Sequence, residues 1–303
     1  MKPCFSVAFN AALVLIAVPV LGAASPQGQR AYPIHYHYNR LLVRPMQARA
    51  SRSTTTLPSF NVTYHGGPIQ PATASYTIFW QPAGTYISPN YKLLVNRFLS
   101  DVGGSPIYGA ATTYFGSNGR VRNESHLGST WTDRTPYPAS LQSDPDTTLQ
   151  KEIAKIMKRN GWQGGLYSQF FIFTAKDAIP VQNIPFCAYH SAFNLTDRRP
   201  VAYSYIPYVG SVNGCNPPYG ITPNNDVDAD GTIISVSHEQ MEMVTDPLLN
   251  AWFDDNNGEI GDLCIFSFGV PYLPDGGNLD LNHHDYFLQE EYSQARGACL
   301  PNL

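Results

Sequence analysis

The sequence predicts one α/β or α+β domain with a central sheet, spanning residues 58–303. Strand-like and helix-like segments alternate along this part of the chain, several strand-like segments are continuous apolar runs, and 43% of the 303 residues are hydrophobic. A chain of this length and hydrophobic content can bury a large core. The same content excludes a disordered polypeptide, and the lack of a Gly-X-Y period excludes a collagen-like fibre.

Three strands and one helix are predicted for the sheet and one of its covering layers. Residues 75–80 form a β-rich run, residues 169–174 a buried strand, and residues 201–208 a further strand. Residues 91–99 have apolar side chains at helical spacing. Their order along the chain is typical of a sheet with helices packed on it.

The clearest helix is predicted over residues 147–159. Asp146 can cap its start, Lys158 and Arg159 suit the negative end of the helix dipole, and Gly161 can close the last turn. Its charged face is expected to be solvated.

A second long helix is predicted over residues 232–245. It should end before Pro247, which disfavours helical geometry at Asp246. Residues 226–231 resemble the start of a calcium loop, but Ser237 stands where such a loop needs a bidentate Glu. We therefore expect an acidic loop that contributes to a cation site, or an ordinary turn, before this helix.

The N-terminal residues 1–24 are predicted to be a signal peptide, because a basic residue precedes the apolar run 7–21 and small residues follow it. This run is shorter than the ~20 residues that a membrane span needs, and no later segment is apolar enough to cross a bilayer. Residues 25–57 are polar and basic, which predicts a flexible arm, or a propeptide cleaved near Arg49 or Arg52. The mature protein is expected to be secreted and extracellular, with no membrane span.

Four cysteines remain after the signal peptide, and an even number in an oxidising compartment favours two disulfides. Three pairings are possible, of which the sequence-local pairs Cys187–Cys215 and Cys264–Cys299 are the simplest. Three Asn-x-Ser/Thr sequons predict a glycoprotein. Their asparagines are Asn61, Asn123 and Asn194.

Charge is distributed unevenly along the chain. The formal net charge is −4, but from Asp226 onward there are 15 acidic residues and one basic residue, Arg296. Such a stretch repels nucleic-acid phosphates and suits cations, so no nucleic-acid partner is expected.

The candidate site lies on the predicted helix 232–245. His238 and Glu242 are four residues apart and therefore project from one face of a helix, about one turn apart. This is the spacing by which His-Glu-x-x-His metallohydrolases present two ligands to zinc, with Glu242 here in place of the second His. Glu239 would be the general base that deprotonates the bound water.

A third ligand has to come from another segment. Glu259 is the preferred candidate, Asp262 is an alternative about 20 residues after the helix, and Asp246 is a weaker option because the helix should be ending there. One imidazole and two carboxylates cancel the charge of a divalent cation, so the metal would be a weaker Lewis acid than in a three-imidazole site. Zinc is the expected metal, with manganese or calcium as alternatives.

Three functions remain open from these residues. The first is a metal-dependent hydrolase of peptide or amide bonds, in which His190 or a Tyr could stabilise an oxyanion. The second is a non-enzymatic extracellular protein that holds a structural cation and binds a wall polysaccharide or a receptor. The third has no metal, with the carboxylates solvated on a surface helix. The chain contains neither a Gly-x-Ser-x-Gly elbow nor a Gly-x-x-x-x-Gly-Lys loop.

Motifs across residues 60–300 resemble the Exordium-like, phosphate-induced protein family. The resembling motifs are Tyr64-His-Gly-Gly-Pro68, Asn225-Asp-Val, Asp230-Gly, Ser237-His-Glu with Glu242, Asp246-Pro247, Ala251-Trp252 and Glu259-Ile-Gly-Asp262-x-Cys264. The resemblance implies a secreted or wall-associated protein, known best in plants and linked to growth responses, but no particular biochemical activity.

The chain departs from the plant form of that family. The plant form has additional cysteines in the segments that here contain only Cys187 and Cys215, which makes a bridge between these two a natural substitute. The Thr245-Asp246-Pro247 sequence is more similar to microbial members. A closer relation to microbial than to plant members is therefore expected.

Overall fold

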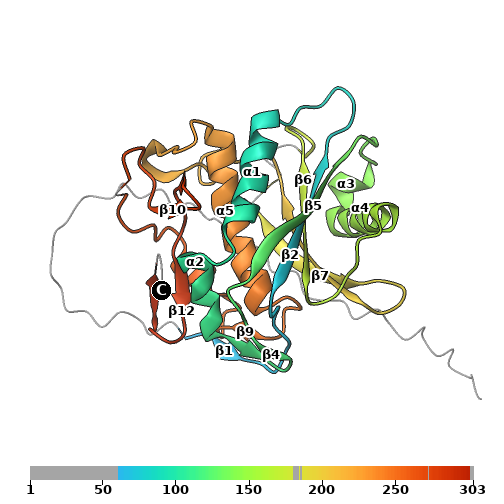
Figure 1. The fold of residues 1–303 in the computed structure, drawn as a ribbon. Helices are drawn as coiled ribbons and strands as arrows, with labels where there is room; N and C mark the ends of the chain where they lie inside the picture. Colours follow the sequence, from blue (N-terminus) through green and yellow to red (C-terminus); the bar gives the residue numbers. More distant parts are fainter. Residues whose placement is uncertain (1–60, 180–183, 185, 272, 301–303) are drawn as a thin grey trace, which may run out of the picture.

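The computed structural model describes residues 61–179, 184, 186–271 and 273–300 (Figure 1). The expected signal peptide (residues 1–24), the expected arm (residues 25–57) and residues 58–60 of the expected domain lie outside the described residues. Within the described residues, no helix is both long and apolar enough to cross a membrane.

A five-stranded sheet forms the centre of the protein, with the order β5-β2-β6-β8-β7. Its strands are β2 (Thr73–Trp80), β5 (Ser125–Asp133), β6 (Ser168–Thr174), β7 (Tyr189–Asn194) and β8 (Pro200–Ile206). All neighbours pair in parallel except β7, which runs antiparallel to β8 at one edge. The strand β6 is buried along its whole length because both faces of the sheet are covered, which explains its continuous apolar run.

Helices cover both faces of this sheet (Figure 1). On one face α1 (Pro89–Asp101) and α5 (Val227–Thr245) enclose a core that includes Phe171 and Phe173. On the other face α4 (Pro145–Asn160) packs against the alternate residues of the same strands. The alternation of side chains along each strand thus divides the interior into two apolar layers.

Shorter elements complete the fold, and those after α5 are all short. Four two-stranded antiparallel sheets pair β1 with β9, β3 with β4, β10 with β11 and β12 with β13. The elements are β1 (Thr63–Tyr64), α2 (Pro106–Gly109), η1 (Ala110–Thr113), β3 (Phe115–Gly116), β4 (Gly119–Arg120), α3 (Ser140–Ser143), η3 (Pro218–Gly220), β9 (Trp252–Phe253), η4 (Asp262–Cys264), β10 (Leu279–Leu281), β11 (His284–Tyr286), β12 (Glu291–Ser293) and β13 (Ala298–Leu300). The predicted mixed class is confirmed, with several sheets and few helices.

The predicted strands and the helix 91–99 are present, with small shifts of their ends. The helix predicted over 147–159 is α4, but its cap is wrong: Asp144, not Asp146, accepts a hydrogen bond from the Thr147 amide, at 3.3 Å. The cap moves because Pro145 occupies the first helical position, where its missing N–H costs no hydrogen bond. Asp146 lies in the first turn instead.

The helix α5 begins five residues earlier than predicted, so the expected acidic loop before it is wrong. Asp226 is the cap and accepts a hydrogen bond from the Ala229 amide, at 3.1 Å, and Asp228 and Asp230 lie in the first turn. Carboxylates are favourable there because of the helix dipole. Gly231 permits the early start, because a Cβ at this position would lie 2.0 Å from the Gly210 carbonyl oxygen.

Candidate metal centre

The helix α5 carries ionisable side chains into the interior of the protein. His238, Glu239 and Glu242 are 7%, 1% and 0% exposed. The helix packs against α1 and the strands β7 and β8, and the C-terminal segment covers it further. The alternative in which these carboxylates are solvated on a surface helix is therefore wrong. Burying carboxylates is costly unless they are paired or bound to a cation.

His238 and two carboxylates form one candidate ligand set. The His238 Nε2 atom lies 3.2 Å from Glu242 Oε1 and 3.7 Å from Asp262 Oδ1. The Asp262 amide donates a hydrogen bond to Glu242 Oε1, at 3.1 Å. Neighbouring ligand atoms around a tetrahedral zinc, with bonds of about 2.0–2.1 Å, are about 3.3 Å apart. A single imidazole nitrogen thus faces two carboxylates at separations that suit a cation.

His190, on the edge strand β7, forms a second set. Its Nδ1 atom lies 3.2 Å from Glu239 Oε2 and 3.5 Å from Glu242 Oε2, and its Nε2 atom lies 3.5 Å from Glu259 Oε2. Burial lowers the pKa of His190, but Glu259, Glu239 and Glu242 outweigh it and raise that pKa well above its ordinary value. The strand pairing of β7 with β8 brings this histidine beside α5.

The structure places the two downstream candidates against different histidines. Glu259, the preferred third ligand, lies near His190, whereas Asp262 lies near His238. Both sets share Glu242, and each set can offer ligand atoms that all lie within 4.8 Å of one another.

Asp246 lies at the C-terminal cap of α5, as expected for the end of this helix. Its Oδ1 atom accepts hydrogen bonds from the Asn250 and Ala251 amides, at 2.6 and 2.7 Å. Burial raises the pKa of Asp246 to about 7, although these two amides oppose the shift. The carboxylate therefore has a local role in closing the turn after the helix.

Gln289 orients the ring of His238 and was not found from the sequence. Its side-chain nitrogen donates to the Gly261 carbonyl, at 2.7 Å, and lies 3.2 Å from His238 Nδ1. In this orientation of the amide, Nδ1 accepts, which corresponds to the ring tautomer with its proton on Nε2. A cation at Nε2 would require the proton on Nδ1 and Gln289 to present its carbonyl oxygen.

Glu291, at the start of β12, is a further residue that sequence reasoning missed. It is fully buried, and neither of its carboxylate oxygens has a hydrogen-bond partner among the described residues. Burial raises its pKa well above the ordinary value; His238 opposes the shift and the neighbouring carboxylate of Glu242 adds to it. No sequence motif marks this position.

A cavity of about 250 Å³ opens onto this centre. Both His238 and Glu239 line it, and its wall includes the Cys187–Cys215 bridge and the apolar side chains of Phe266 and Phe268. The pocket does not include Glu242 or Glu259 in its lining, and both are fully buried. The centre therefore has an accessible side and a closed side.

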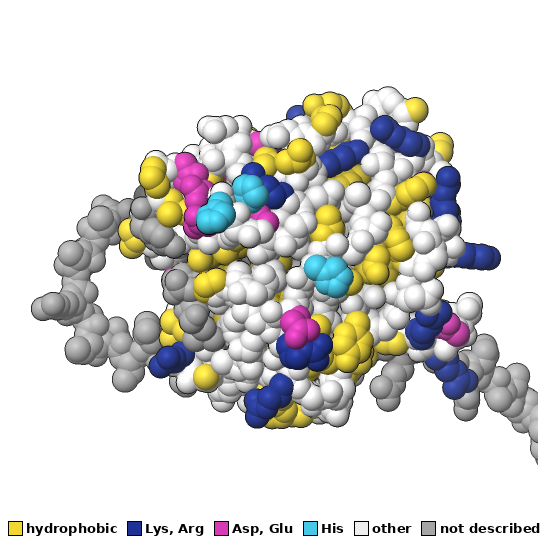
Figure 2. Space-filling model, in the orientation of Figure 1, with side chains coloured by type: hydrophobic (Ala, Val, Ile, Leu, Met, Phe, Trp, Pro, Cys, Tyr) yellow, Lys and Arg dark blue, Asp and Glu magenta, His cyan; other side chains and the backbone are white. Residues whose placement is uncertain are grey.

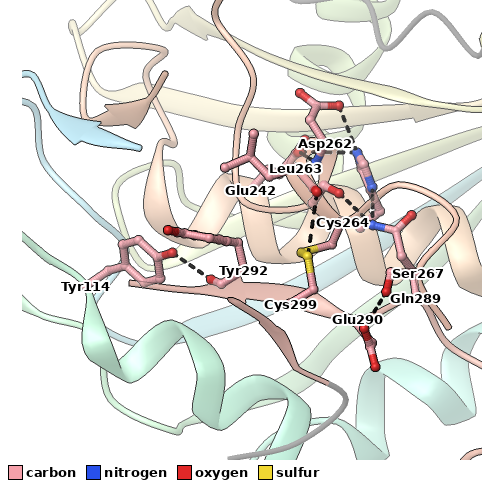
Figure 3. Close-up of a disulfide and its surroundings, with 12 residues drawn as sticks. Tyr114, Glu242, Asp262, Leu263, Cys264, Ser267, Gln289, Glu290, Tyr292 and Cys299 are labelled. Atoms are coloured by element: carbon pink, nitrogen blue, oxygen red, sulfur yellow. Dashed lines mark hydrogen bonds and ion pairs between the residues drawn. A yellow bond between two sulfur atoms is a disulfide. The ribbon is translucent and has the colours of Figure 1, made fainter. Parts of the chain in front are cut away.

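Two disulfides hold the segments that surround the centre, and they are the sequence-local pairs favoured above. Cys187 pairs with Cys215 and Cys264 with Cys299, with Cα atoms 5.4 and 5.6 Å apart. Cys187 lies just before β7, which carries His190. Figure 3 shows the second bridge beside Asp262.

The three sequon asparagines lie away from the ligand sets. Asn61 is exposed, Asn194 is half-buried at the end of β7, and the Asn123 side-chain nitrogen donates to the Ser105 carbonyl, at 2.9 Å. Their glycosylation stays a prediction.

Charged side chains are unevenly distributed on the surface as well. On the face drawn in Figure 2, acidic and histidine side chains lie together over the segment that carries β10, while Lys and Arg are spread over the rest of that face. This arrangement agrees with the acidic excess of the C-terminal part of the sequence.

Comparison with known proteins supports the resemblance to the Exordium-like, phosphate-induced proteins. Residues 168–284 match the phosphate-induced protein 1 conserved region. The chain is similar to Protein EXORDIUM-like 3 of Arabidopsis thaliana, at 42% identity over 53 residues, which is 16% of this chain and 16% of the relative. No solved structure matches the chain.

The matched region contains both candidate ligand sets but ends before Gln289 and Glu291. The family and the two disulfides are typical of an extracellular protein. The closer relation to microbial members stays a prediction.

Proposed function

We propose that the chain is a secreted, metal-dependent hydrolase of peptide or amide bonds, with its cation at His238, Glu242 and Asp262. The observation that carries this proposal is the cavity that reaches both His238 and Glu239. A structural metal site is closed, whereas a catalytic one keeps a position open for water or substrate. The family relation does not specify an activity, so the proposal depends on this geometry.

Glu239 is the proposed general base. It follows His238 in the sequence, lines the cavity, and has its Oε2 atom 3.2 Å from His190 Nδ1, which fixes the orientation of the carboxylate. A bound divalent cation would polarise the substrate carbonyl and lower the pKa of a water molecule. Glu239 would accept the proton of that water and deliver it to the leaving amine.

Asp262 takes the place of Glu259 as the third ligand in this proposal, because it faces the same nitrogen as Glu242 does. One neutral imidazole and two carboxylates leave no net positive charge on a divalent cation. The cation would be a weak Lewis acid, so we expect slow turnover with zinc or manganese.

The proposal is tested by metal analysis and a peptide-hydrolysis screen on the secreted protein. We expect bound zinc or manganese in the wild type, and loss of the cation at this position in His238→Ala and Asp262→Asn. Glu239→Gln should keep the metal and lose turnover. The matched control is Glu124→Gln, which changes an exposed carboxylate that forms an ion pair with Arg122.

Two results would contradict this function. Hydrolysis that survives Glu239→Gln would exclude Glu239 as the base. Calcium retained in the wild type, without hydrolysis of any substrate in the screen, would favour a structural cation in a protein that acts by binding a polysaccharide or receptor.

A further inference from the structure

Glu242 presents its two carboxylate oxygens to two different histidines. Oε1 lies 3.2 Å from His238 Nε2, and Oε2 lies 3.5 Å from His190 Nδ1. A carboxylate can bind one cation through one or both oxygens, or it can bridge two cations by giving one oxygen to each. Two-metal hydrolytic sites have cations about 3.5–4 Å apart, a distance that one bridging carboxylate spans.

The second histidine has a candidate ligand set of its own, in which its Nδ1 atom faces Glu242 and its Nε2 atom faces Glu259. His190, Glu242 and Glu259 are each 0% exposed and offer ligand atoms within 4.8 Å of one another. They come from β7, from α5 and from the segment before η4, so the main chain of three separate elements fixes them.

The charge of the buried centre also exceeds what one cation can balance. The carboxylates of Glu239, Glu242 and Glu259 are all at most 1% exposed, and Asp262 is close to them. Against these stand two histidines. Glu291 supplies independent evidence, since its fully buried carboxylate has no hydrogen-bond partner among the described residues and interacts electrostatically with His238 and Glu242. Buried charges are stable when paired or bound to metal.

We infer that the protein binds two divalent cations, bridged by Glu242. The outer cation is the one proposed above, at His238 and Asp262 beside the cavity, and the inner cation is held by His190 and Glu259. The inference rests on the proposed function for the outer position only. The side chains of the inner position are 0% exposed and do not line the cavity, so in this proposal its cation is structural and orients Glu242 for the outer one.

To test this inference, the secreted protein is loaded with Mn²⁺ and the unbound Mn²⁺ is removed by dialysis. The amount of bound manganese and the electron paramagnetic resonance spectrum are then measured. We expect two equivalents in the wild type, with the broadened spectrum of an exchange-coupled pair. Glu259→Gln should retain one equivalent and give the six-line spectrum of isolated Mn²⁺, and so should Asp262→Asn. Glu124→Gln should behave as the wild type.

The two proposals fail in different ways. One equivalent in the wild type, unchanged in Glu259→Gln and lost in Asp262→Asn, would overturn the inner cation and leave the outer one; His190 would then be a protonated counter-ion. One equivalent that depends on Glu259 but not on Asp262 would overturn both the bridged pair and the proposed catalytic position. The wild-type spectrum decides between one cation and a coupled pair even if a variant fails to fold.

Discussion

The main chain at Gly261 passes very close to two candidate ligands, His238 and Glu242. A Cβ at this position would lie 2.7 Å from His238 Nδ1 and 2.9 Å from Glu242 Oε1. Both side chains are buried, so neither can move aside without disturbing the other ligand set. Only glycine allows the main chain to pass this closely while its carbonyl holds Gln289.

Gly261→Ala should therefore weaken metal binding more than folding. We expect the affinity for Mn²⁺ to fall at least about tenfold, the effect typical of changes that misplace metal ligands. Titration with Mn²⁺ measures the affinity, and thermal unfolding measures the stability. Gly109→Ala is the control, because its Cβ would meet only Asn123 at 3.5 Å. Unchanged affinity in Gly261→Ala would show that no ligand set uses His238 or Glu242.

Glu152, on α4, should make the stability of the protein depend on pH, and it lies away from the candidate centre. Burial raises its pKa from 4.5 to about 7, although a hydrogen bond from Lys155, at 2.6 Å, opposes the shift. A raised pKa in the folded state means that the stabilising contribution is complete below about pH 4.5 and is lost as the pH rises through 7. Glu152→Gln should remove this loss. Denaturant unfolding at several pH values checks it: the two proteins should diverge between pH 4.5 and 7, and parallel curves would contradict the assignment.

Candidate site residues could be predicted from the sequence where their spacing along one helix was enough to place them together. The helical spacing of His238 and Glu242 needs no tertiary information, so these two could be found. His190 was considered only for an oxyanion, since its approach to Glu259 depends on the pairing of β7 with β8. Glu291 reaches the centre through β12, and no sequence pattern signals that packing.

Capping residues determine where helices begin, and the predicted starts of two helices are wrong. Both α4 and α5 start at an Asp that lies earlier than local periodicity suggested, Asp144 and Asp226. Apolar periodicity marks the part of a helix that packs, whereas the first turn is set by capping and by the dipole. The interiors of both helices were therefore predicted and their starts were not.

Asp144→Ala should destabilise the protein without affecting the metal centre. The cap accepts the Thr147 amide, and its loss should cost ~1 kcal/mol of unfolding free energy. The helix α4 covers the face of the sheet opposite α5, so bound manganese should not change. Asp144→Asn, which keeps an acceptor, is the control for stability. A loss of metal in Asp144→Ala would show that the two faces are coupled.

The whole molecule combines a well-packed layered sheet with a C-terminal segment of short hairpins. The sheet and its helices hold most of the core, whereas η4 and the β12–β13 hairpin are joined by the Cys264–Cys299 bridge and by the Tyr292 amide bonded to the Ile260 carbonyl, at 3.0 Å. The mixed fold was predictable from alternating periodicities. The position of the hairpins was not, because their strands have only three residues each.

Replacing both Cys264 and Cys299 with Ser should lower the unfolding free energy by roughly 3–4 kcal/mol, as expected for a loop with a sequence separation of 35 residues. It should also reduce bound manganese, because Asp262 and Glu291 lie on the two segments that the bridge joins. Chemical denaturation and metal analysis measure the two effects. The Cys187→Ser, Cys215→Ser protein is the comparison. Full metal content in the Cys264/Cys299 variant would show that the bridge does not position the ligands.

The Cys264–Cys299 bridge also has a consequence for the order of events during biosynthesis. The strands β2, β5, β6, β7 and β8 precede Cys299 by at least ninety residues, so the sheet can assemble while the hairpin is still being made. The bridge closes only after Cys299 has emerged and met an oxidant. We therefore expect the proposed outer cation to bind late in maturation, after the bridge has fixed the segment that carries Asp262.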